Sequence, residues 1–150
     1  MPRWVDHGVD EYQRRLPGWL GFTLRDVPLG QRSGKADPLR ATADEGERQL
    51  KAIGRDTRVV AFERTGKAID SEGLAVWIDE LRNDACDGSL LVGGPEGLAP
   101  ACFERADAIW SISAMTLAHP VVKVLLLEQI YRACAILDGS PYHRGQSTLR

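Results

Sequence analysis

Three separated segments carry residue types that could build a ligand site. An apolar stretch, Leu90 to Val92, leads directly into Gly93-Gly94-Pro95-Glu96-Gly97, where glycine lets the backbone approach a ligand closely. Residues 113–119 form a second loop before a long apolar helix, and Pro141-Tyr142-His143-Arg144 forms a polar tail. Two loops and a polar tail indicate one site.

A further polar segment, between Pro28 and Pro38, has only a superficial likeness to a phosphate-binding P-loop. From Gly30 to Lys35 the glycine spacing is one residue short and the final Ser or Thr is absent, so we reject that assignment. Two interpretations of the segment stay open. It is either a basic loop that contacts RNA phosphates or a variable surface loop.

The composition predicts one globular domain. The chain has 150 residues, 43% of them hydrophobic and 27% charged, which suffices for a core within a single domain spanning residues 1–150. No secretory signal is visible, and Lys123, Glu128 and Arg132 interrupt the longest apolar stretch, Pro120 to Leu137. We therefore expect a cytoplasmic protein without a membrane span.

Cysteines and histidines are too scattered to predict a disulfide framework or a metal centre. Cys86, Cys102 and Cys134 are odd in number and widely spaced, which is typical of a reducing compartment. The three histidines are equally dispersed along the chain. We expect no metal.

The charge distribution is more informative than the formal net charge of −2, which argues against binding nucleic acid through positive field alone. Residues 1–40 carry seven Lys or Arg against five Asp or Glu, and residues 113–150 carry four against two, whereas the middle is strongly acidic. If the two ends converge, they form a locally basic face. An ordinary solvated surface is equally compatible with the charges.

The apolar periodicity predicts alternating helices and strands. Val5, Val9, Tyr12 and Leu16 form one stripe of a helix that ends at Pro17. Further helices are expected at 39–53, 71–81 with Ser71 as its cap, 100–105 and 120–137, and strands at 58–62, 89–92 and 108–112, with another short strand beginning at Phe22 and Leu24.

This order predicts an α/β fold with a mostly parallel sheet and helices on both faces, because the strands are apolar without strict alternation. In such sheets ligands gather beyond the carboxyl ends of the strands. That rule places the segments that begin at Phe62, Gly93 and Ser113 side by side.

The last helix is apolar around nearly its whole circumference, so it must be buried on all sides. One sheet covers only one side of a helix, and we therefore expect a second subunit, as a homodimer, to cover the remainder. Glu128 and Arg132 lie at positions i and i+4 and can pair with each other.

Several motifs together resemble one known family over essentially the whole chain. They are Pro2-x-Trp4-Val5, Glu11-Tyr12-x-Arg14-Arg15, Lys35-Ala36-Asp37, Glu45-Gly46-Glu47, residues 91–98, residues 110–120, Glu128, Tyr131-Arg132-Ala133 and Pro141-Tyr142-His143-Arg144. With these residues the sequence resembles the ribosomal RNA large subunit methyltransferase H family. That family comprises SPOUT-class, S-adenosylmethionine-dependent methyltransferases of pseudouridine N3 in 23S rRNA.

The resemblance implies a C-terminal trefoil knot, a homodimer with cofactor sites near its interface, and the ribosome as the partner. It also implies the residues that contact S-adenosyl-L-methionine, which are Phe62, Gly94, Ser113, Ala114, Met115, Thr116, Leu117 and Ala118. These positions belong to the three segments that the strand-end rule selects. A tight turn that only connects strand to helix is the alternative explanation for the glycines.

The resemblance also suggests how the tail takes part in catalysis. The sulfonium donor is already activated, so the protein must align the acceptor and help its imide nitrogen to lose a proton. By residue type, His143 is the candidate base, Arg132 and Arg144 are the candidate cations, and Tyr142 is a stacking or hydrogen-bonding partner. The alternative is a tail that only docks on RNA. His119 is expected to shape or cap the last helix.

Members of the family normally begin with an apolar strand before the Pro-x-Trp helix, whereas Met1 here directly precedes Pro2. We therefore expect the chain to lack that strand and a neighbouring strand to lose its backbone partners. Three other functions stay open: a SPOUT-like methyltransferase for another RNA position, a ribosome-binding dimer with impaired catalysis, and a flavodoxin-like module. The absence of G-x-G-x-x-G disfavours the last.

Overall fold

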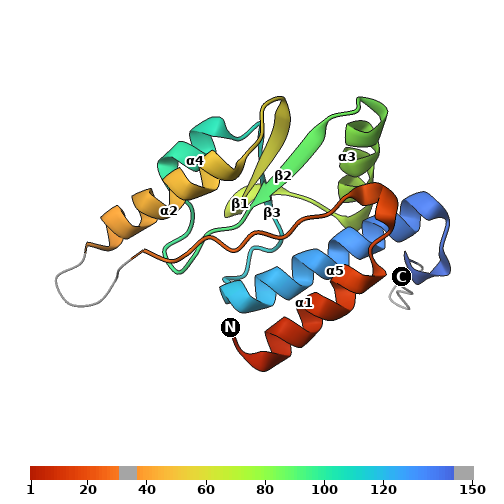
Figure 1. The fold of residues 1–150 in the computed structure, drawn as a ribbon, viewed down its shortest axis with the longest axis horizontal. Coiled ribbons are helices and arrows are strands. Elements are labelled where there is room, and N and C mark those ends of the chain that lie inside the picture. The colour runs from red at the N-terminus through yellow and green to blue at the C-terminus, as the bar shows by residue number, and fades with distance from the viewer. Residues whose placement is uncertain (31–36, 144–150) are drawn as a thin grey trace.

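A three-stranded parallel sheet forms the centre of the protein. The computed structural model describes residues 1–30 and 37–143, with His143 described in its backbone alone. The strands are β1 (Thr57–Ala68), β2 (Asp87–Leu91) and β3 (Ala108–Ser111), and their order in the sheet is β2-β1-β3 (Figure 1). Both neighbours run parallel to β1, with Val59 opposite Ser89 and Val60 opposite Ala108. The predicted parallel α/β sheet is confirmed.

Five α-helices connect or flank these strands, at the positions that the sequence predicts to within two residues. They are α1 (Arg3–Arg15), α2 (Pro38–Ala52), α3 (Ser71–Asn83), α4 (Pro100–Arg105) and α5 (His119–Asp138), with short 3₁₀ turns η1 (Gly18–Leu20) and η2 (Pro141–His143). Proline occupies the first turn of α2, α4 and α5, where its missing N–H is not needed.

The cap of α3 differs from the prediction. The Asp70 carboxylate accepts the hydrogen bond from the Gly73 N–H at 2.7 Å, and Ser71 is already the first helical residue. Asp and Ser cap helices about equally well, so the sequence did not distinguish these neighbours. The Ser71 hydroxyl is thereby available to another partner, which lies on α5.

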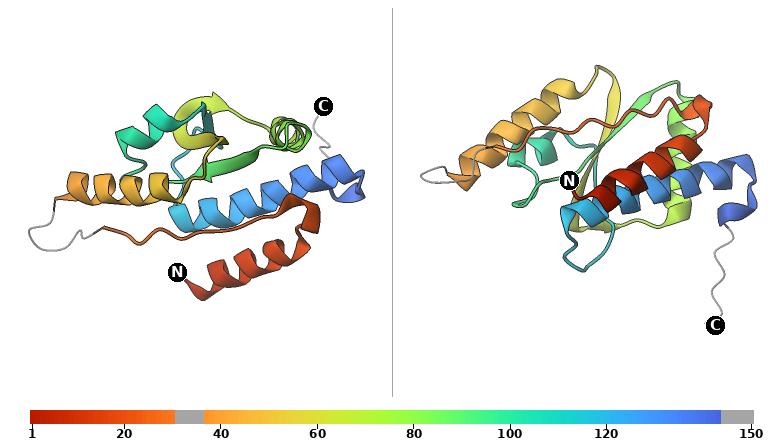
Figure 2. Two further views of the ribbon diagram at one scale, coloured as in Figure 1. Left: turned by 45° about the horizontal axis from the view of Figure 1, so that its top comes forward. Right: turned by 60° about the horizontal axis from the view of Figure 1, so that its bottom comes forward.

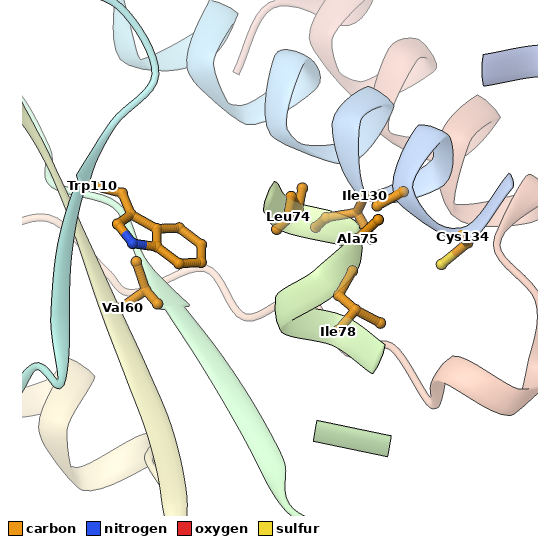
Figure 3. Close-up of a cluster of buried hydrophobic side chains, with 8 residues drawn as sticks. Val60, Leu74, Ala75, Ile78, Trp110, Ile130 and Cys134 are labelled. Atoms are coloured by element: carbon orange, nitrogen blue, oxygen red, sulfur yellow. The ribbon is translucent and has the colours of Figure 1, made fainter. Parts of the chain in front are cut away.

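Helices cover both faces of the sheet, as predicted, because successive residues of β1 point to opposite sides. Val60 of β1 and Trp110 of β3 face α3 and α5, where they pack with Leu74 and Ile130 (Figure 3). The opposite face buries a second cluster against α2 and α4, consisting of Val59, Ala61, Leu91, Leu98, Ala99 and Cys102. These two layers hold the carboxyl ends of the strands in place.

Helix α5 is covered largely from within the chain. Helix α1 lies alongside it (Figure 2), and Val5 and Val9 pack with Leu127 in a third buried cluster. Helix α3 packs against another side of α5. Helices α1 and α3 therefore cover part of the apolar circumference of α5 within the chain, and the homodimer stays a prediction.

The strand predicted to begin at Phe22 and Leu24 does not form. Both side chains are half-buried against the α1–α5 cluster, but no strand in the described part of the chain pairs with this extended segment. A strand requires a neighbour for its backbone groups, and the apolar pattern does not reveal whether one is present. Helix α2 holds the end of the segment, since Glu45 accepts from the Gly30 N–H at 2.7 Å and Arg48 donates to the Pro28 carbonyl at 3.0 Å.

Candidate functional site

A cavity of about 500 Å³ lies beyond the carboxyl ends of β2 and β3, beside the middle of β1. Its wall includes residues 62–64 of β1 and residues of the segments that follow β2 and β3, so the predicted meeting of the segments that begin at Phe62, Gly93 and Ser113 is confirmed. Strand β1 itself continues to Ala68, beyond the predicted end at Phe62. The lining residues are Phe62 to Arg64, Val92 to Leu98, Phe103, Ile112, Ser113, Met115 to His119 and Val122. Its volume is within the range of small-molecule sites.

The turn of residues 93–97 requires glycine because its backbone atoms lie very close to one another. A Cβ on Gly93 would lie 2.4 Å from the Gly97 carbonyl carbon and 2.6 Å from the Leu98 nitrogen. Gly97 has φ of +80° and donates its N–H to the Gly94 carbonyl at 3.0 Å. Gly93 is therefore required by the turn itself, and both Gly93 and Gly94 line the cavity.

Helix α2 supports the start of the same turn. The side-chain amide of Gln49 donates to the Val92 carbonyl at 3.0 Å. This bond ties the last residue before the glycines to the helix that covers the opposite face of the sheet. The position of the turn is thus determined by tertiary packing as well as by its own hydrogen bond.

The loop after β3 is held by its own serines. Ser111 donates its hydroxyl to the Ser113 carbonyl at 2.9 Å, and the Ser113 hydroxyl accepts from the Met115 N–H at 3.0 Å. The backbone N–H groups of Thr116 and Leu117 make no hydrogen bond with any residue that the structure describes. These donors suit the polar edge of a ligand in the cavity.

Ala114 is the one predicted loop residue that is not among the lining residues. Its carbonyl instead accepts a hydrogen bond from Nη1 of Arg64 at 3.3 Å. Arg64 thus joins the segment after Phe62 to the loop after β3. This link between two of the three segments was not visible in the sequence.

Glu63 and Arg64 were missing from the predicted site, although they directly follow Phe62. The pairing of β1 with β3 shifts register between Phe62 and Lys67, so the intervening residues leave the regular ladder beside the cavity. Hydrogen bonds from Thr65 hold the pKa of Glu63 below its ordinary value, and the cavity wall therefore includes an ionised carboxylate.

Phe103 of α4 and Val122 of α5 were also missed, because neither carries a spacing signal in the sequence. His119 lines the cavity as the first residue of α5. The residue before it, Ala118, occupies the N-cap position and no side chain caps the helix, so the expectation that His119 caps α5 is wrong.

Arg132 and Tyr142 lie together in a second cluster, around Glu128 on the C-terminal half of α5. Nη2 of Arg132 is 2.7 Å from Oε1 of Glu128, which confirms the predicted pair. The Tyr142 hydroxyl donates to the same oxygen at 3.1 Å, and the Arg132 guanidinium lies 4.9 Å from the centre of the Tyr142 ring. We call these three residues the tail cluster.

Burial and the neighbouring groups Tyr12 and Glu128 raise the pKa of Tyr142 well above its ordinary value. The phenol therefore keeps its proton at neutral pH, and Tyr142 cannot serve as a base. The hydrogen bonds with Glu128 likewise raise the pKa of Arg132. Tyr142 thus fits the stacking or hydrogen-bonding role.

Aromatic rings extend the tail cluster towards α1. The Tyr131 and Tyr142 rings are 4.5 Å apart between centres, and the Tyr12 and Tyr131 rings are 6.3 Å apart. Arg15 lies 5.4 Å from the centre of the Tyr12 ring. Residues near the two ends of the chain therefore converge, which is the condition under which the charge distribution predicts a locally basic face.

Two of the predicted site elements cannot be placed. Arg144 and the loop of residues 31–36 lie outside the described residues, and His143 is described in its backbone alone, as the last residue of η2. Both interpretations of that loop, contact with RNA phosphates and a variable surface loop, therefore stay open.

Within one chain, the cavity and the tail cluster are far apart. The cavity meets α5 in its first turn, at His119 and Val122, whereas Arg132 lies in the C-terminal half of the helix. A helical rise of about 1.5 Å per residue puts Arg132 about 20 Å along the axis from His119. The structure therefore brings the predicted cofactor residues together but separates them from the predicted catalytic side chains.

Other kinds of site find little support. Residues 1–30 and 37–143 contain no group of three or more His, Cys, Asp or Glu side chains that could hold a metal ion. None of the helices in the described ranges combines the length and apolar character that a membrane crossing requires.

Fold and site together define an α/β protein with a cavity of small-molecule size at one edge of a parallel sheet, between a glycine turn and the start of a helix. The chain belongs to the SPOUT methyltransferase family: the family model described as a predicted SPOUT methyltransferase matches residues 1–143. The protein is accordingly an enzyme of the methyltransferase class.

Curated relatives agree with this assignment. The ribosomal RNA large subunit methyltransferase H of Alkalilimnicola ehrlichii is 49% identical over 144 residues, which cover 96% of this chain and 92% of the relative. Proteins of the same name from Pseudomonas fluorescens and Marinomonas sp. are 46% and 44% identical, each over 96% of this chain and 93% of the relative. The resemblance found in the sequence is confirmed.

Proposed function

We propose that this protein transfers a methyl group from S-adenosyl-L-methionine to N3 of a pseudouridine in 23S rRNA of the large ribosomal subunit. One observation carries the proposal. The three segments to which the resemblance assigns the cofactor surround a single cavity, in a chain nearly half identical to relatives named ribosomal RNA large subunit methyltransferase H.

The residue types that line the cavity suit the chemical groups of this cofactor. Gly94 has no side chain to exclude a bulky adenosyl group, and the backbone of residues 113–118 supplies donors and acceptors for the adenine edge and the ribose. Met115, Leu117 and Phe62 supply apolar walls. When bound, the cofactor supplies a methyl group on a sulfonium, which is an activated donor.

The tail supplies the acceptor chemistry. Pseudouridine N3 is a weakly acidic imide nitrogen, so His143 takes its proton while Arg132 and Arg144 stabilise the negative charge that develops on the ring. The Tyr142 ring stacks on the pseudouridine base, or its hydroxyl hydrogen-bonds to that base. Nitrogen then forms its bond to carbon as the carbon–sulfur bond breaks, and the donor leaves as a neutral thioether.

The active unit in this proposal is a homodimer in which the tail of one subunit completes the cavity of the other. The axial distance of about 15 Å between Val122 of the cavity wall and Arg132 in one chain supports this arrangement. Trp4 of α1 and Val121 of α5 remain 56% and 40% exposed, which leaves apolar surface for a second copy. The C-terminal trefoil knot and a cytoplasmic location complete the proposal.

Mixed dimers test the composite site. We expect Gly94→Phe, which fills the cavity, and Arg132→Met, which disables the tail cluster, each to abolish methyl transfer. After subunits of the two variants are exchanged, half of the dimers are mixed and each has one intact site. We therefore expect recovery to about a quarter of the wild-type rate. If exchange is verified by mass and no activity returns, the composite site is wrong.

The reaction itself is tested by methyl incorporation into ribosomes that carry or lack pseudouridine. We expect labelled methyl only where pseudouridine is present, and faster transfer to assembled ribosomes than to naked 23S rRNA, because a net charge of −2 gives little general attraction to RNA. Equal labelling without pseudouridine would identify another RNA position as the target. Binding of ribosomes without any transfer would favour the catalytically impaired dimer.

A further inference from the structure

Glu128 has more partners than a surface ion pair requires. Its Oε1 accepts hydrogen bonds from Nη2 and Nε of Arg132, at 2.7 and 3.0 Å, and from the Tyr142 hydroxyl at 3.1 Å. The Glu128 and Arg132 side chains are only 19% and 24% exposed. A single Glu128 oxygen thus links Arg132 of α5 to Tyr142 of η2, which follows the end of α5.

The second oxygen of the Glu128 carboxylate accepts a hydrogen bond from Gln129, which is itself held by Ser71 of α3. Nε2 of Gln129 donates to Oε2 of Glu128 at 2.7 Å, and Oε1 of Gln129 accepts from the Ser71 hydroxyl at 2.5 Å. Ser71 begins α3, directly after β1, whose Phe62 lines the cavity. A continuous line of hydrogen bonds therefore runs from the start of α3 to the tail cluster.

We propose that Glu128 is a positioning residue, which holds the Arg132 guanidinium and the Tyr142 ring as one rigid unit in front of the base to be methylated. This inference rests on the proposed function. A carboxylate only accepts hydrogen bonds, so it can satisfy the arginine and the phenol at the same time. Gln129 and Ser71 prevent the carboxylate from rotating away, and the acceptor then meets a prearranged surface.

Glu128→Gln keeps the size of the side chain and removes its charge. We expect the rate of methyl transfer at saturating ribosome and cofactor to fall by about ten- to a hundredfold, with the calorimetric affinity for S-adenosylmethionine unchanged. The matched control is Glu47→Gln, which breaks another i, i+4 pair, with Lys51 on α2 at 3.1 Å, and should leave the rate unchanged. An unchanged rate in Glu128→Gln would overturn the inference.

A double-mutant cycle with Tyr142→Phe separates positioning from general damage. If Glu128 acts through Tyr142, the double variant is hardly slower than the slower single variant, whereas the product of the two single effects would show independence and overturn the inference. Should Glu128→Gln fail to fold, Gln129→Met leaves the ion pair intact and should still slow transfer. Full activity in that variant would count against the network.

The same cycle, measured on melting temperature, distinguishes failure of this inference from failure of the proposed function. If the wild-type protein methylates no rRNA, the proposed function is wrong. Non-additive melting shifts for Glu128→Gln and Tyr142→Phe would still support a coupled unit, and additive shifts would refute it.

Discussion

Gly93→Ala is expected to weaken S-adenosylmethionine binding by up to about a hundredfold and to lower the melting temperature. The added Cβ would lie 2.4 and 2.6 Å from backbone atoms of Gly97 and Leu98, and backbone cannot move aside as a flexible side chain can. Overpacking of this kind costs about 1–3 kcal/mol. In a chain of this length each kcal/mol lowers the melting temperature by about 2–4 °C.

Calorimetric titration and a thermal melt measure the two effects. Gly18→Ala is the matched control, because a Cβ on Gly18 meets no atom within 4 Å and its φ is not in the left-handed region. We expect the control to bind the cofactor as the wild type does. Normal affinity in Gly93→Ala would show that the turn after β2 does not form part of the cofactor site.

The second large effect is expected at the tail, where His143→Ala should lower turnover by about 10² to 10⁴ while the affinity for S-adenosylmethionine stays constant. A general base contributes this range of rate, and the base acts on the acceptor rather than on the donor. Single-turnover methylation of ribosomes, together with calorimetry, separates the two quantities. His7→Ala, on the exposed side of α1, is the control and should be as active as the wild type.

The alternative role for the tail, docking on RNA, gives a different result. A docking residue would raise KM for ribosomes and leave kcat intact at saturation, because substrate binding and transition-state binding weaken together. Unchanged kcat in His143→Ala would therefore remove this histidine from the chemistry. Variants of Arg132 and Tyr142 would then be tested for a docking role in the same way, by measuring KM for ribosomes and kcat separately.

Strand pairing and helix burial depend on neighbours in space that a local apolar pattern does not identify. Phe22 and Leu24 have the apolar alternation of a strand, yet the segment is only extended, because pairing requires a second strand. The apolar circumference of α5 predicts extensive burial of this helix, and Val5 and Val9 of α1 supply part of that burial within the chain. In both cases the apolar pattern correctly predicts which side chains are buried, but it does not identify the element that pairs with the strand or covers the helix.

The amino-acid sequence by itself determined the helices, the three central strands and the segments that follow them. Periodicity, proline and glycine act over a few residues, and parallel strands necessarily bring their carboxyl ends to one edge of the sheet. Tertiary structure alone placed Phe103 in the cavity wall, joined Arg64 to Ala114, gathered Tyr142 and Arg132 around Glu128, and separated that cluster from the cavity. These features depend on distances between residues far apart in the chain, which packing sets and spacing does not encode.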